Sequence, residues 1–174
     1  MKIKTEILLQ VMHVLAWIVF IGILINAGTL LVTWGLSFNR PEAARNLYNG
    51  LNLEPARAYD FGHYSVLVLM RVVVAVFEAL TAWTLLKVLA DIKLASPFRI
   101  EIAKLLQRMS AFIFLGWIAA MEHNSYSTWL RTKVPTLDNP PIATNVIFIA
   151  GIVFILAQVF RKGVELQTEA ELTV

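Results

Sequence analysis

Four long apolar stretches, almost free of charge, constrain this chain more than any other feature of its sequence. They cover about residues 7–36, 64–89, 102–123 and 142–161. A helix needs roughly 20 apolar residues to cross a bilayer, and each stretch reaches that length, the third only by including its neighbours. Because backbone groups in lipid must be satisfied within the segment, we predict an all-α integral membrane protein, a single domain with four transmembrane helices in an antiparallel bundle.

The composition supports this prediction. Of the 174 residues, 58% are hydrophobic and only 16% are charged, too few to cover the surface of a soluble domain of this size. There is no cysteine, which excludes disulfides, cysteine-ligated zinc and iron–sulfur clusters. The net charge of +3 gives no basic field of the kind that binds nucleic acid. We expect the lipid bilayer to be the main partner, with no cofactor and no direct contact with nucleic acid.

The positions of lysine and arginine predict the orientation. Outside the apolar runs at the centre of these spans (residues 7–36, 64–86, 109–121 and 142–160), nine of these residues fall at the N-terminus, between the second and third runs, and after the fourth run, whereas five fall in the other two loops. By the positive-inside rule, both termini face the cytoplasm. Residues 162–174 then form a short acidic cytoplasmic tail.

Loop residues mark where helices begin. Pro41 predicts a short helical stretch that extends to Leu47. Two pairs of residues are typical of an N-cap followed by proline in the first helical turn: Ser96-Pro97 and Asn139-Pro140. They predict that the third and fourth long helices begin there.

Arg71 and Glu78 lie within the second span, where a charge costs about 2.5 to 3.5 kcal/mol and so requires a partner or water. The depth of each residue can be estimated from the helical rise, counted from the middle of its span. This estimate places Asn26, Arg71, Glu122 and Asn145 in the outer half of the bundle and Glu78 nearer its centre. We predict that Arg71 pairs with Glu122. A pair with Glu78 is the competitor, although about 10 Å of helix separates the two. The intramembrane polar cluster predicted in this way comprises Asn26, Arg71, Glu78, Glu122 and Asn145.

Two interpretations of this cluster remain open. A buried ion pair can serve only to fix the register of packed helices. Alternatively, the charges mark a ligand site or a proton path, because Glu78 has no basic partner at its depth and would be protonated, or bonded to Thr81, Ser110 or a ligand.

Three histidines raise a cofactor hypothesis. His63 and His123 are both on the predicted outer side, where two imidazoles at one depth can ligate a haem iron, whereas His13 is on the inner side. The alternative is that both are ordinary hydrogen-bonded histidines at the ends of their spans. No metal-binding, phosphate-binding or nucleophile motif is present in the sequence.

The end of the sequence carries a family resemblance. Residues 160–174 read FRKGVELQTEAELTV, and the third helix is preceded by Ser96-Pro97-Phe98. With the four-span layout, these features resemble the bacterial four-helix membrane family catalogued as domain of unknown function 2975, over the whole chain. The family tail tends to carry another polar residue where this chain has Ala170. The resemblance implies a multi-pass protein of the inner (plasma) membrane, often encoded beside a short helix-turn-helix regulator, and implies no enzymatic activity.

These observations lead to three functional hypotheses. The first is a non-enzymatic membrane regulator or sensor that binds a cytoplasmic partner, such as a helix-turn-helix transcription regulator, through its middle loop and tail. The second is a ligand-binding or proton-coupled protein built on Arg71, Glu78 and Glu122, and the third is a haem-binding redox protein. The tail residues expected to bind the partner are Glu165, Leu166, Glu169, Glu171, Leu172 and Val174.

Overall fold

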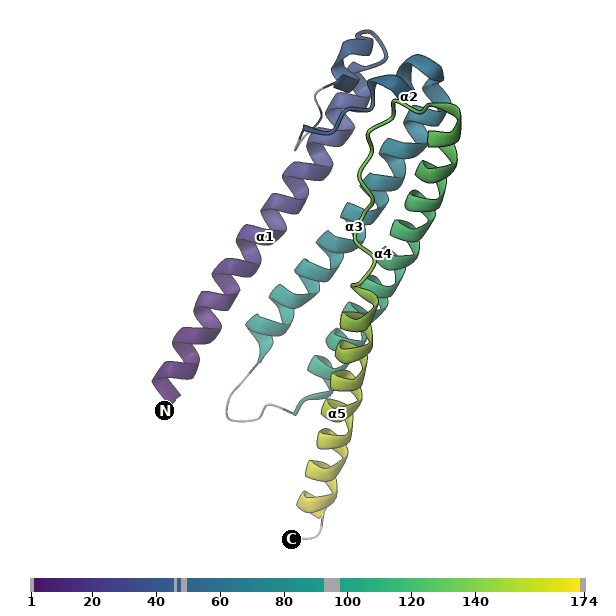
Figure 1. The fold of residues 1–174 in the computed structure, drawn as a ribbon. Coiled ribbons are helices and arrows are strands. Elements are labelled where there is room, and N and C mark those ends of the chain that lie inside the picture. The colour runs from purple at the N-terminus through teal and green to yellow at the C-terminus, as the bar shows by residue number, and fades with distance from the viewer. Residues whose placement is uncertain (1, 46, 48–49, 93–97, 173–174) are drawn as a thin grey trace. The chain divides into compact units, whose positions relative to one another are not determined.

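The computed structural model describes residues 2–45, 47, 50–92 and 98–172, and these residues are predominantly helical (Figure 1). Six helical segments follow one another along the chain. They are α1 (Lys2–Leu36), the 3-10 helix η1 (Pro41–Arg45), α2 (Glu54–Tyr59), α3 (Phe61–Asp91), α4 (Ile100–Lys133) and α5 (Ile147–Leu172).

Four of these helices are long and apolar enough to cross a membrane. The candidate spans are Glu6–Leu36, Phe61–Asp91, Ile100–Lys133 and Ile147–Ala170. At about 1.5 Å per residue, a span of 31 residues measures roughly 46 Å, more than the roughly 30 Å thickness of the hydrocarbon core. Such helices must tilt or extend beyond the core. The prediction of an all-helical protein with four helices long and apolar enough to span a membrane is confirmed for the described residues.

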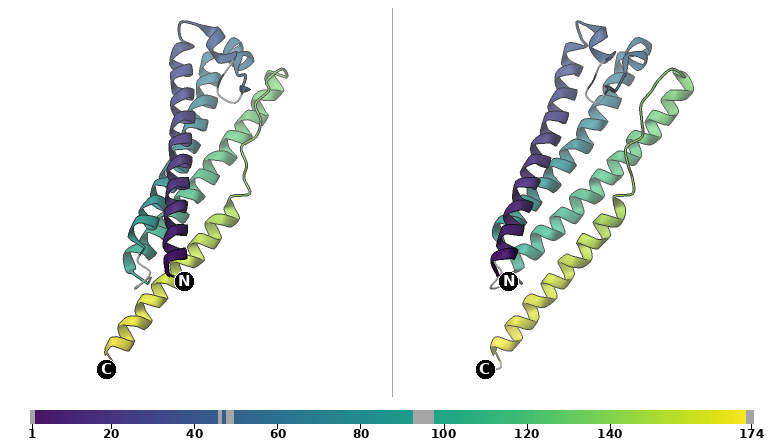
Figure 2. Two further views of the ribbon diagram at one scale, coloured as in Figure 1. Left: turned by 90° about the vertical axis from the view of Figure 1, so that its left-hand side faces the viewer. Right: turned by 60° about the vertical axis from the view of Figure 1, so that its left-hand side comes forward.

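The start of the last helix differs from the prediction. Asn139 and Pro140 do not begin a helix: α5 begins at Ile147, and residues 137–144 form an irregular, largely extended segment. This segment runs back along α4 (Figure 2), and the side chain of Asn124 in α4 bonds to both the amide and the carbonyl of Ile142, at 2.8 Å each. These bonds hold the backbone of Ile142 against α4. The proposed Ser96-Pro97 cap lies outside the described residues.

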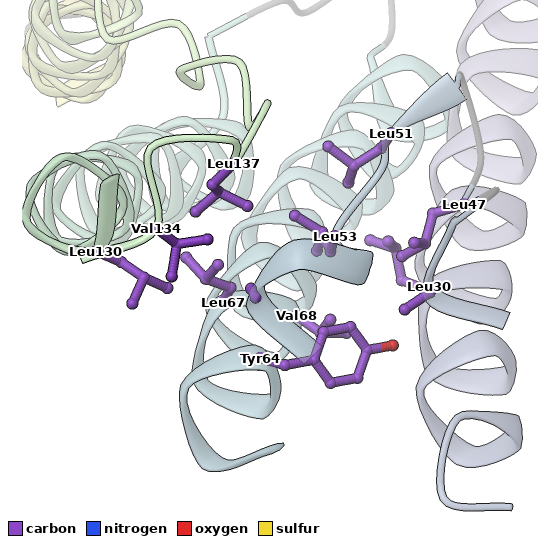
Figure 3. Packing of buried hydrophobic residues seen from close by; sticks show 12 residues of the cluster. Leu30, Leu47, Leu51, Leu53, Tyr64, Leu67, Val68, Leu130, Val134 and Leu137 are labelled. Atoms are coloured by element: carbon purple, nitrogen blue, oxygen red, sulfur yellow. The ribbon is translucent and has the colours of Figure 1, made fainter. Parts of the chain in front are cut away.

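The helices contribute to two compact units. Unit 1 comprises Met1–Ile21, Glu78–Phe114 and Asn145–Val174, and unit 2 comprises Gly22–Phe77 and Leu115–Thr144. Unit 2 has an apolar core to which α1, α3, α4 and the loops all contribute (Figure 3). Its buried members are Leu30, Ala44, Leu47, Leu51, Leu53, Ala56, Tyr64, Leu67, Val68, Leu130, Val134 and Leu137.

The connection between α1 and α3 is part of that core rather than a solvated loop. Leu53 and Ala56 are completely buried. Arg57 donates from Nη2 to the carbonyl of Ser37 at 3.1 Å, which ties α2 to the end of α1. At the exposed side, Arg45 Nε binds Glu54 Oε2 at 2.8 Å, and this hydrogen bond and the negative charge of Glu54 raise the pKa of Arg45. The predicted helical stretch from Pro41 is present as η1, which ends at Arg45.

Unit 1 packs α3, α4 and α5 together around a smaller apolar cluster. Its buried members are Val88, Ile102, Leu106, Met109, Val153 and Ala157. Ser110 of α4 donates from Oγ to the carbonyl of Ala150 in α5 at 2.9 Å, and both residues are buried. Near the start of α4, the rings of Phe98 and Phe160 meet edge to face at 5.4 Å. These two contacts fix the antiparallel alignment of α4 and α5.

Candidate functional site

Arg71 is held in unit 2 by oxygens that carry no formal charge. Its guanidinium donates to Asn139 Oδ1 from Nη2 at 2.5 Å and from Nε at 3.2 Å. Nη2 also donates to the carbonyl of Pro140 at 2.7 Å. The cation on α3 is thus solvated by one side-chain amide and one backbone carbonyl of the extended segment. Hydrogen bonds from a charged donor are stronger than neutral ones, so these contacts fix the segment against α3.

Asn139 is completely buried, and its amide nitrogen faces α4. Nδ2 donates to Ser127 Oγ at 2.9 Å and lies 3.3 Å from His123 Nε2. Arg71 determines this orientation, because an amide turned the other way would present its NH₂ group to a guanidinium that has no acceptor capacity. Arg131 of α4 donates to the backbone carbonyl of the same asparagine. One residue therefore links α3, α4 and the extended segment.

The orientation of Asn139 also sets the tautomer of His123. Since Nε2 accepts from the amide, the proton of the neutral ring must be on Nδ1, which lies 3.3 Å from Asn124 Oδ1. Asn124 in turn holds Ile142 through the two bonds described above. Each hydrogen bond in the chain from Arg71 to Ile142 therefore has a defined donor and a defined acceptor. We call Arg71, His123, Asn124, Ser127, Arg131 and Asn139 the Asn139 network.

Chemically, this network can hold the cation of Arg71 and position the backbone of the extended segment. His123 and Asn139 are completely buried and Ser127 almost so, which leaves their hydrogen-bonding groups turned toward each other. Within the network, Arg131 Nε is the one described buried atom with no hydrogen-bond partner. The arrangement favours a structural clamp over a catalytic site.

The predicted pair of Arg71 and Glu122 is wrong. Glu122 is exposed and forms no ion pair in the described part of the chain. The physical reason lies in the helix: Glu122 precedes the buried His123, and consecutive helical residues point about 100° apart. Arg71 instead finds its acceptors in Asn139 and Pro140.

The other predicted members of the polar cluster have separate environments. Asn26 is half-buried in unit 2. Glu78 and Asn145 belong to unit 1, and both side chains are exposed on the protein surface. Within the described residues, no hydrogen bond or ion pair joins Asn26 to Arg71.

The two outer histidines are engaged elsewhere, which argues against a bis-histidine haem site. Both ring nitrogens of the buried His123 face asparagine side chains. His63 Nδ1 lies 2.5 Å from the hydroxyl of Tyr126, and its ring stacks on Tyr59 with centroids 5.7 Å apart. Nor do the described residues contain a group of three or more His, Asp or Glu side chains placed to hold a metal ion.

Sequence reasoning missed most of the Asn139 network. A signal was available on α4, where His123, Ser127 and Arg131 recur every fourth residue and therefore share one face. Polar side chains repeated in this way on a membrane helix indicate an internal polar contact. The position of Asn139 carried no such signal, because its place beside Pro140 was equally typical of a helix start.

Comparison with known proteins adds no relative: no protein-family model, curated protein or solved structure matches this chain.

Proposed function

We propose that the chain is a small protein of the bacterial inner membrane that acts as a non-enzymatic regulator or sensor. It would bind a cytoplasmic partner through the middle loop between α3 and α4 and through the end of α5. A helix-turn-helix transcription regulator is the partner that the family resemblance implies.

The observation that carries this proposal is the course of α5. The apolar part of this helix ends at Phe160, but the helix continues to Leu172. Over residues 165–170 every side chain is exposed, including Leu166 at 55% exposure. Twelve residues of helix span about 18 Å, so α5 projects well beyond its apolar part. An exposed helical projection with an apolar residue among charged ones is suited to binding another protein.

The charges of this projection are partly neutralised within it. Lys162 Nζ lies 3.0 Å from Glu165 Oε2, an exposed pair of the kind that contributes little to stability. Leu166 and Glu169 are exposed, whereas the side chains of Glu171 and Leu172, and all of Val174, lie outside the described part of the chain. We therefore base the binding test on Leu166.

The alternative of a ligand-binding or proton-coupled protein has less support. It relies on Arg71, Glu78 and Glu122 acting together, but the hydrogen bonds of Arg71 go to Asn139 and Pro140. The Asn139 network accounts for the intramembrane arginine as part of the structure.

The orientation can be tested with reporter fusions. We expect a fusion after Val174 to report a cytoplasmic location and a fusion inserted at Arg40 to report the opposite side, because the lysine and arginine bias favours cytoplasmic termini. Alkaline phosphatase and fluorescent-protein reporters at each site would give complementary signals. Phosphatase activity from the fusion after Val174 would refute the orientation, and with it the cytoplasmic partner.

Partner binding can be tested with a truncation and a pair of point variants. We expect deletion of residues 164–174 to abolish recovery of the partner in pull-downs from native cells while leaving the membrane part folded. Leu166→Glu should reduce recovery at least tenfold, because it removes an exposed apolar contact. Gln167→Glu is the matched control, since it adds the same charge at the neighbouring exposed position without removing an apolar side chain. Equal recovery with the full-length and truncated chains would eliminate this role of α5.

A further inference from the structure

Unit 1 contains an apolar groove between α4 and α5. It has a volume of about 490 Å³, within the range typical of small-molecule sites. Its lining includes Ala111 and Phe114 from α4 and Gly151 and Phe154 from α5. A Cβ atom added at Gly151 would meet no other atom within 4 Å, so the space beside this glycine is open. The two phenylalanine side chains are each about 45% exposed, which gives the groove apolar sides.

The groove becomes polar at one end. Gln107 of α4 lines it there, and Lys104 precedes Gln107 by one helical turn. On α5, Gln158 and Arg161 follow Phe154 by four and seven positions and therefore share its face. The contacts of Ser110 with Ala150 and of Phe98 with Phe160 show that these turns of the antiparallel helices lie at one level.

The basic side chains at this end have no acidic counterpart. Lys104 and Arg161 are exposed, and neither of them forms an ion pair with a described residue. This contrasts with Arg99 and Lys162, which lie close to Glu101 and Glu165. Both helices change from apolar to charged at this level, which is where the polar headgroups of a bilayer would lie.

We propose that this groove binds one anionic phospholipid of the surrounding bilayer. An acyl chain would lie along Ala111, Phe114, Gly151 and Phe154, and the phosphate group would be held by Lys104 and Arg161. A basic residue near a membrane surface favours an anionic lipid by about fivefold. Charge complementarity therefore selects an anionic lipid over a zwitterionic one, while the groove supplies affinity for any acyl chain.

The test uses the full-length chain in mild detergent with equal amounts of phosphatidylglycerol and phosphatidylcholine of the same acyl composition. Bound lipids are counted by native mass spectrometry. We expect phosphatidylglycerol to be retained at least about fivefold over phosphatidylcholine. Equal retention of the two lipids would overturn the proposal.

Two kinds of variant separate the acyl and headgroup contributions. Gly151→Leu fills the groove and should lower the retention of both lipids, whereas Gly28→Leu, where an added Cβ also meets open space, should not. Lys104→Gln with Arg161→Gln should remove this preference, lowering retention of phosphatidylglycerol by at least about fivefold, and leave phosphatidylcholine unchanged. The matched control is Arg40→Gln with Lys133→Gln, which removes two exposed basic charges elsewhere.

The glutamine variants alter exposed side chains, so the test does not depend on the folding of the leucine variant. Unchanged phosphatidylglycerol retention in either groove variant would overturn the proposal. So would a dimer that carries no lipid and that Gly151→Leu dissociates, because the groove would then be an interface between two copies of the chain.

Discussion

Replacing Asn139 with leucine is expected to lower the free energy of unfolding by about 4 kcal/mol. The substitution removes two hydrogen bonds from Arg71 and leaves its charge without the amide that solvates it, at a cost of roughly 1.5 to 3 kcal/mol. It also removes the donor to Ser127 and His123, each contact contributing about 1 kcal/mol. Equilibrium unfolding of the purified chain in detergent measures the loss.

Two comparisons make this test specific. Asn145→Leu is the matched control: Asn145 precedes α5, its side chain is exposed, and the change should stay within about 0.5 kcal/mol. In a double-mutant cycle, Arg71→Met combined with Asn139→Leu should cost about 1 to 2 kcal/mol less than the sum of the single variants. Strictly additive losses would show that Arg71 and Asn139 do not stabilise each other.

The long helices could be predicted from the sequence because hydropathy is a local property. An uninterrupted apolar stretch must form a helix in lipid whatever its neighbours are, so the four stretches located α1, α3, α4 and α5. Helix ends depend on more than local sequence. Asn139-Pro140 has the composition of a helix start, yet the bonds that Asn139 makes with α3 and α4 hold it in an extended segment.

The environment of Arg71 shows which part of a site the sequence can specify. The cost of a charge in the membrane predicts that this arginine has a partner, and it does. The identity of the partner depends on side-chain direction. A carboxylate is the strongest acceptor for a guanidinium, but Glu122 is one residue away from the inward face of α4 and is exposed. A neutral amide from a loop takes its place, because only the folded chain brings Asn139 within reach.

The apolar residues in the connection of α1 to α3 do not form a long apolar stretch, so hydropathy alone does not predict their burial. Leu47, Leu51 and Leu53 are nevertheless buried. Their burial follows from the contacts that the fold provides: Leu53 packs among residues of α1, α3 and the stretch after α4 (Figure 3). An isolated bridge between Asn52 and Asp138 joins the same connection to the extended segment. The loops of unit 2 therefore form one folded layer at the ends of its helices.

Leu53→Ala is expected to destabilise the protein by about 3 kcal/mol, since truncating a fully buried leucine removes apolar contacts and leaves a cavity. Leu36→Ala is the matched control at the end of α1: this leucine is 56% exposed, so its loss should cost at most about 0.5 kcal/mol. Thermal unfolding in detergent compares the two. If Leu53→Ala were as stable as the control, the connection would contribute nothing to the core. A large loss would show instead that unit 2 depends on its loop layer as well as on its long helices.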